Sequence, residues 1–85
     1  MTLFEDEPME FDEREIDLSM LREDLVGELQ AINQYQDHIE ALDDDEAIKV
    51  LEHIRDDEKE HVAELTKLIQ RLDSTQAEKF MKEGL

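Results

Sequence analysis

The sequence has no cysteine, and this absence excludes several kinds of site at once. Disulfides, thiolate zinc sites and iron–sulfur clusters all need cysteine sulfur, so any metal site here has to use carboxylates and imidazoles. Glycine and proline are also scarce, with 2 and 1 residues, which suits long helices better than sheet. We therefore expect an all-α fold.

Positive charge is scarce as well, because 9 Lys and Arg stand against 26 Asp and Glu, for a formal net charge of -17. This balance argues against binding to nucleic acid or to an anionic membrane surface, and it makes cations the natural partners. Long apolar runs are missing, and no basic segment followed by an apolar one opens the chain. We expect a cytoplasmic protein with no membrane span. With 85 residues its core is thin, so partners or metal should supplement it.

Residues 1–15 are dense in acid and show no helical periodicity, so we expect a flexible segment ahead of one domain at residues 16–85. Two interpretations of this segment stay open. It is either a solvating acidic tail or a segment that docks on a partner chain through its apolar side chains, which are Leu3, Phe4, Met9 and Phe11.

Two heptad seams predict two long helices. The first helix is expected at about 18–42, with Asp17 as its N-cap. Its seam consists of Leu18, Leu21, Leu25, Glu28, Ile32, Tyr35, Ile39 and Leu42. The second helix is expected to run to Leu72. Its seam consists of Ala47, Leu51, Ile54, Glu58, His61, Leu65, Leu68 and Leu72.

The acidic stretch 43–46 joins the two predicted helices, with Asp43 and Glu46 in capping-box spacing. So short a connection folds the helices back into an antiparallel hairpin. A short third helix is expected at 76–83, capped by Ser74 or Thr75 and ended by Gly84.

Both seams are apolar except near their centres, where Glu28 interrupts the first and Glu58 and His61 interrupt the second. Each centre is roughly 15 residues, or about 22 Å, from the turn, so the three side chains should meet across the hairpin. Burying them without compensation would cost several kcal/mol per ion. Arg55 and Lys59, the nearest cations, lie off the seam. A divalent metal explains the pattern better than an internal salt bridge.

A di-iron carboxylate site takes one Glu from each of two helices and a Glu-x-x-His from each of two more. One chain offers half of this set. We therefore predict a homodimer of hairpins that completes a four-helix bundle and holds two irons at its interface. Calcium, manganese or zinc could also occupy such a site.

Several residues outside this set have two interpretations. Tyr35 is either a hydrogen-bond donor or radical sink near the metal, or simply a packed core residue. His38 and His53 are expected on the surface, and Asn33 and Gln36 toward solvent or a neighbouring subunit. Gly27 inside a helix suggests close approach of another helix. A second apolar surface, for association beyond a dimer, is expected from Val26, Val50, Val62 and Ile69.

Over residues 18–83 the sequence resembles the encapsulated ferritins, two-helix half-bundles of the ferritin-like superfamily. The resemblance rests on Glu-Leu-Gln-Ala-Ile-Asn-Gln-Tyr at 28–35, on the 30-residue step from Glu28 to Glu58, and on Asp-Glu-Lys-Glu-His at 57–61. The Glu-x-x-His alone is also similar to rubrerythrins and bacterioferritins. The chain departs from the family at Gly27 and Gln30, where members often carry carboxylates of a metal entry site.

The resemblance implies a ferroxidase centre in which Glu58 bridges two irons, His61 caps one, and Glu28 completes the ligand set. It also implies a ring of dimers, such as a decamer, inside an encapsulin nanocompartment. Encapsulation, fusion to the shell protein and a free state all stay open. Two other functions remain as alternatives: a rubrerythrin-like peroxide reductase, and a helical hairpin that binds metal or serves structure without turnover.

Overall fold

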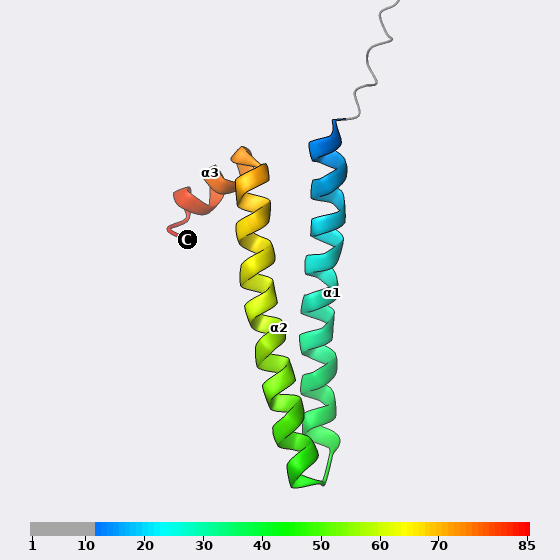
Figure 1. Ribbon diagram of the computed structural model, residues 1–85. Helices are drawn as coiled ribbons and strands as arrows, with labels where there is room; N and C mark the ends of the chain where they lie inside the picture. Colours follow the sequence, from blue (N-terminus) through cyan, green and yellow to red (C-terminus); the bar gives the residue numbers. More distant parts are fainter. Residues whose placement is uncertain (1–11) are drawn as a thin grey trace, which may run out of the picture.

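The computed structural model describes residues 12–85, which form three α-helices. Helices α1 (Glu13–Ala41) and α2 (Asp45–Leu72) lie side by side and antiparallel, and residues 42–44 join them (Figure 1). Helix α3 (Ser74–Lys82) turns away after the end of α2 and lies on its outer side (Figure 1). The expected all-α hairpin with a short third helix is confirmed. From Glu13 onward, none of the helices combines the length and apolarity needed to cross a lipid bilayer.

Helix α1 begins earlier than predicted. Asp12, rather than Asp17, is its N-cap, and the Asp12 carboxylate accepts a hydrogen bond of 2.9 Å from the Arg14 amide. The prediction was wrong because an apolar seam marks where a helix packs, whereas its capping residue marks where it starts. Residues 13–15, assigned above to the acidic segment, are helical. The apolar side chains of that segment lie outside the described residues.

The other helix ends are set by aspartates next to the predicted caps. Asp44, not Asp43, caps α2 by accepting from the Ala47 amide at 2.9 Å. Asp73, not Ser74 or Thr75, caps α3 by accepting from the Gln76 amide at 3.1 Å. The predicted end of α2 at Leu72 is confirmed. Helix α3 runs from Ser74 to Lys82 rather than over 76–83, and Gly84 follows its C-cap Glu83. Gly84 adopts φ 81, a conformation that ends a helix readily.

The core within residues 12–85 is as thin as the chain length implies. Leu18 and Ile69, at 1% and 5% exposure, are its only buried hydrophobic residues. The expectation that Ile69 lies on a second apolar surface is wrong, because α3 folds back so that Phe80 and Ile69 line one small hollow. Val26 and Val50, at 52% and 50% exposure, lie on the surface as expected.

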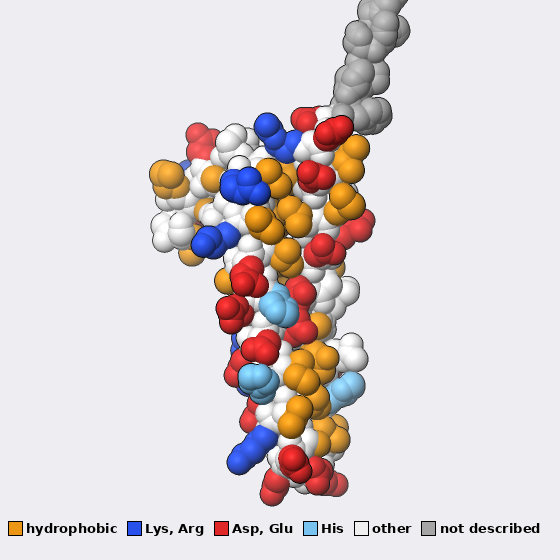
Figure 2. All heavy atoms as spheres, in the orientation of Figure 1, with side chains coloured by type: hydrophobic (Ala, Val, Ile, Leu, Met, Phe, Trp, Pro, Cys, Tyr) orange, Lys and Arg blue, Asp and Glu red, His pale blue; other side chains and the backbone are white. Residues whose placement is uncertain are grey.

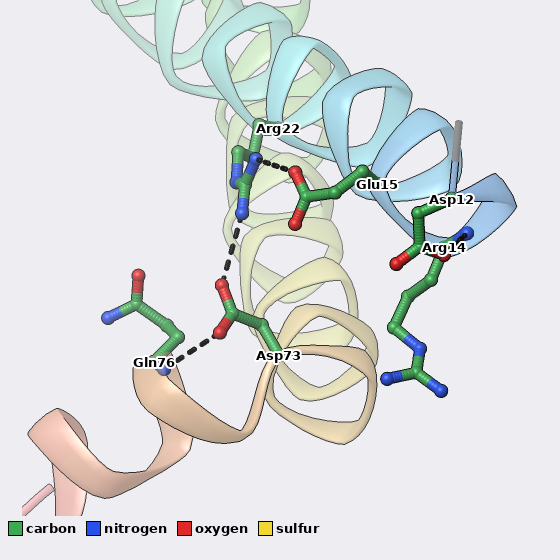
Figure 3. A network of polar contacts seen from close by, with 6 residues as sticks. All are labelled: Asp12, Arg14, Glu15, Arg22, Asp73 and Gln76. Atoms are coloured by element: carbon green, nitrogen blue, oxygen red, sulfur yellow. Dashed lines mark hydrogen bonds and ion pairs between the residues drawn. The ribbon is translucent and has the colours of Figure 1, made fainter. Parts of the chain in front are cut away.

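An ion pair ties the start of α1 to the corner between α2 and α3 (Figure 3). Arg22 Nη2 donates to Asp73 Oδ2 at 3.0 Å, while the other carboxylate oxygen of Asp73 caps α3. The capping bond from Gln76, and then Arg22, hold the pKa of Asp73 below its usual value. Asp73 therefore links all three helices.

Candidate metal centre

Helix α1 supplies Glu28 and helix α2 supplies Glu58 and His61, about halfway along the hairpin. Glu58 and His61 stand three residues apart and so share one face of α2. His61 Nδ1 lies 3.2 Å from Glu58 Oε1 and 3.4 Å from Glu28 Oε1. One ligand atom from each residue lies within 4.8 Å of the other two. The structure thus brings together the three residues that interrupt the apolar seams.

The three side chains differ in their access to solvent. Glu58 and Glu28 are half-buried, at 19% and 26% exposure, whereas His61 is 48% exposed. A hollow between α1 and α2 opens beside them, and both Glu28 and His61 line it. An ion could therefore reach the His61 imidazole and the Glu28 carboxylate from this hollow.

The three side chains shift one another's pKa values. The hydrogen bond between the two carboxyl groups raises the pKa of Glu28 and lowers that of Glu58. The hydrogen bond to Glu58, and then that to Glu28, raise the pKa of His61. A metal ion would displace any proton held by these groups, because coordination needs the carboxylates ionised and the imidazole neutral.

The donor set fits a transition metal. Two carboxylates and one imidazole suit iron, manganese or zinc, whereas calcium prefers oxygen donors alone. Three side chains cannot fill the coordination sphere of two metal ions, so the group supports a pair of ions only with a second copy. Ligation by Glu28, Glu58 and His61 remains a prediction.

The two other histidines are on the surface, as expected. His53 lies 3.4 Å from Asp57 on the same helix face, and its side chain is 77% exposed. His38 is exposed near the end of α1. Tyr35 is half-buried two turns from Glu28 and does not belong to the group of three. Both interpretations of Tyr35 remain open.

A polar contact between the helices was missed by the sequence interpretation. Gln36 was expected to face solvent or another subunit, but its Oε1 accepts a 2.9 Å bond from Arg55 Nη1. Arg55 is 19% exposed and lies one turn from Glu58. The signal was available, because pairs across an antiparallel hairpin have a nearly constant sum of residue numbers. Gln36 with Arg55 and Glu28 with His61 share almost the same sum.

Gly27 has no close neighbour within residues 12–85. A Cβ atom built there would meet nothing within 4 Å, apart from its own helix backbone and adjacent residues. Helix α2 is therefore not the helix whose approach would need a glycine. Gly27 lines the hollow beside Glu28 instead, and approach by another chain stays a prediction.

The sequence matches the family described as EncFtn-like over residues 4–85. The chain belongs to the EncFtn-like family. This membership confirms the resemblance to encapsulated ferritins that the residues around Glu28 and Glu58 indicated.

Two proteins of Myxococcus xanthus (strain DK1622) are similar to this member of the EncFtn-like family. The encapsulin nanocompartment cargo protein EncC is 46% identical over 57 residues, which are 67% of this chain and 44% of EncC. The encapsulin nanocompartment cargo protein EncB is 35% identical over 66 residues, which are 78% of this chain and 42% of EncB. The matched region thus spans less than half the length of each relative.

Proposed function

We propose that two copies of this chain form a ferroxidase, which oxidises Fe(II) to Fe(III) for iron storage or detoxification. The observation that carries the proposal is the convergence of Glu28, Glu58 and His61, whose ligand atoms lie within 4.8 Å of one another. This is half of the ligand set of di-iron carboxylate proteins. A two-fold dimer would bring the two halves together and hold two irons at the interface.

Fe(II) is the substrate of this reaction, and the three side chains would have separate tasks. Glu28 and Glu58 would stabilise the higher charge of Fe(III), because hard oxygen donors favour it. His61 would supply one nitrogen per iron and leave coordination positions for the oxidant. Two Fe(II) ions give up two electrons. Dioxygen takes them with two protons to form hydrogen peroxide, or peroxide takes them with two protons to form two waters.

The names of the relatives support a location for this activity. EncC and EncB are named as cargo of an encapsulin nanocompartment. We place the dimers in a ring, such as a decamer, inside an encapsulin shell in the cytoplasm. The shell would retain the Fe(III) that an open ring cannot hold.

Two equivalents of Fe(II) per dimer, added without oxygen and followed by air, test the proposal. We expect ferric absorbance to rise within seconds to minutes, and to be lost in Glu28→Ala and His61→Ala. His53→Ala is the matched control, because it removes an exposed imidazole from the same helix. If the wild type gave no ferric absorbance, the ferroxidase proposal would be wrong, and if Glu28→Ala and His61→Ala kept the wild-type rate, the proposed site would be wrong.

The same experiment separates the alternatives. A hairpin that only binds metal would take up Fe(II) or zinc without turnover in air. A peroxide reductase would react with added hydrogen peroxide much faster than with dioxygen and would need an electron donor, since this sequence has no cysteine of its own for a rubredoxin site.

A further inference from the structure

A chain of polar contacts crosses the hairpin next to the metal centre. Arg55 of α2 donates from Nη1 to Gln36 Oε1 of α1 at 2.9 Å, and from Nε to Asp56 Oδ1 at 3.1 Å. Gln36 in turn donates from Nε2 to Glu40 Oε2 at 2.8 Å. Both ends of the Gln36 amide therefore have a partner, so Gln36 presents its oxygen to Arg55 in a fixed orientation.

The link between Arg55 and Gln36 lies on one side of Glu58. Arg55 precedes Glu58 by three residues and His61 follows it by three, so they flank it at about 60° on either side of the helix. In the part of the chain that the structure describes, α1 and α2 are joined by no polar side-chain contacts other than this link and that of His61 with Glu28. The two lie about 9 to 12 Å apart along the hairpin, with Glu58 between them. The link therefore connects the helices on the side of Glu58 that the metal ligands do not.

The guanidinium of Arg55 is well suited to hold the two helices at one separation. The Arg55 side chain is 19% exposed, so an N–H group without an acceptor would be costly. Nη1 uses Gln36 of the other helix, and Nε and Nη2 use Asp56 of its own helix. Because the guanidinium is planar and rigid, bonds to both helices at once restrain the distance between them. The ammonium of a lysine, on a flexible stem, would restrain it less.

Glu28 and Glu58 need such a restraint when they bind a cation. Their ligand oxygens lie within 4.8 Å of each other, and coordination needs both carboxylates ionised. Two ionised carboxylates this close repel each other. On the face shown in Figure 2, further Asp and Glu side chains gather around the middle of the hairpin and add to this repulsion. Among the described residues, His61 is the only basic side chain that pairs with either carboxylate.

We infer that Arg55 and Gln36 are positioning residues of the metal centre. Their hydrogen bond holds α1 against α2 beside Glu58, so that Glu28 and Glu58 stay close enough to share an ion when both are ionised. The bonds of Arg55 and Gln36 go to each other and to neighbouring carboxylates that are not ligands, so the two residues act through the helix spacing. The inference rests on the metal centre proposed above and adds to it the contact that keeps its two halves at binding distance.

Cobalt(II) titrations of the whole chain test this role, because the visible absorption of bound cobalt reports coordination geometry as well as affinity. We expect Gln36→Leu and Arg55→Lys to raise the dissociation constant for cobalt at least about tenfold, and to shift or weaken the visible bands at saturation. Arg55→Lys keeps the positive charge, so it tests the link even if Gln36→Leu is unfolded. Gln36→Glu offers Arg55 a charged acceptor and should restore both affinity and bands, which a general loss of packing would not allow.

Arg22→Lys is the matched control, because Arg22 also forms an ion pair between helices, with Asp73, but at the open end. It should leave cobalt affinity and the visible bands unchanged. Wild-type affinity and bands in Arg55→Lys, an equal loss in Arg22→Lys, or no recovery in Gln36→Glu would each overturn the inference and leave the metal centre intact. If the wild type bound neither cobalt nor Fe(II), the metal centre itself would be wrong, and this inference with it.

Discussion

Nδ1 of His61 lies 3.2 Å from Oε1 of Glu58, one turn apart on α2. This bond, with the one to Glu28, keeps a proton on the imidazole at a higher pH than usual, because it raises the pKa of His61. The same nitrogen is in position to bind a metal ion. Protons and metal therefore compete for this atom.

Metal affinity should consequently rise with pH. Below the raised pKa of His61 the imidazole is charged and a metal ion has to displace a proton, whereas above that pKa it does not. Zinc titrations by calorimetry between about pH 5.5 and 8.5, in buffers of different ionisation enthalpy, would report affinity and proton release. We expect proton release to decrease as pH rises. In His61→Ala, both the rise of zinc affinity with pH and the decrease in proton release should be much weaker. If neither changed, the proton released on zinc binding would come from another group.

The contribution of His61 to the stability of the metal-free fold should fall as pH rises, whereas metal affinity should rise. A raised pKa of His61 means that its bonds to Glu58 and Glu28 stabilise the fold at low pH, below its unfolded pKa, and are lost as pH rises through the folded pKa. Asp73 has the opposite effect. Its lowered pKa means that the bonds of its charged carboxylate stabilise the fold at neutral pH, and that this stabilisation is lost as pH falls through the folded pKa. Urea unfolding of the metal-free chain at several pH values, with His61→Ala and Asp73→Asn, would separate the two contributions.

The cap of α3 should be worth about 1 kcal/mol of unfolding free energy. Asp73→Ala removes both the bond from the Gln76 amide and the ion pair with Arg22. Asp73→Asn keeps a capping oxygen and loses only the charge, so we expect it to cost clearly less. Urea unfolding followed by circular dichroism measures both. Equal stability of the two variants would mean that the cap contributes nothing.

Ile69 should be among the most sensitive positions in the chain, because it is one of the two buried hydrophobic residues in residues 12–85. Ile69→Val should cost about 0.5 to 1.5 kcal/mol, and Ile69→Ala about 2 to 5 kcal/mol. Val26→Ala, at a position 52% exposed, is the control and should change stability little. Thermal unfolding of the zinc-loaded protein would rank the three. If Val26→Ala cost as much as Ile69→Ala, the surface around Val26 would be an interface.

The hydrogen bond between Gln36 and Arg55 should stabilise the fold, because it gives the charged guanidinium of Arg55 an acceptor. Arg55 is 19% exposed, so Gln36→Leu would leave part of a half-buried guanidinium without its acceptor. We expect a loss of about 1 to 3 kcal/mol. Gln36→Glu supplies a charged acceptor and should recover most of this stability. A Gln36→Glu variant as unstable as Gln36→Leu would show that shape, not the hydrogen bond, is what matters.

The sequence predicted those parts of the structure that follow from the heptad pattern of the two long helices. Seam counting placed Glu28 opposite Glu58 and His61, and it placed the end of α2 at Leu72, because both depend only on the helical repeat. The cap was misplaced by one residue at Asp44 and by one or two residues at Asp73, since runs of Asp, Ser and Thr offer several side chains that can cap a helix.

Ile69 was misassigned for a different reason. It lies off the seam of α2, and its burial depends on how α3 packs against α2. The heptad pattern of α1 and α2 gives no information on the position of α3. The pairing of Gln36 with Arg55 could have been found from the nearly constant sum of residue numbers across the hairpin, but the apolar pattern alone does not show it. Completion of the metal centre by a second copy stays a prediction, because one chain brings together only Glu28, Glu58 and His61.

The connection at residues 42–44 has a consequence for how the hairpin closes. Three polar contacts join segments at growing separation along the chain: 19 residues for Gln36 with Arg55, 33 for Glu28 with His61, and 51 for Arg22 with Asp73. Loop entropy makes the nearest contact the first to form. We therefore expect the hairpin to zip from its turn, to assemble the three ligands midway, and to fray from its open end. Amide hydrogen exchange should be slowest near the turn and fastest around Asp73.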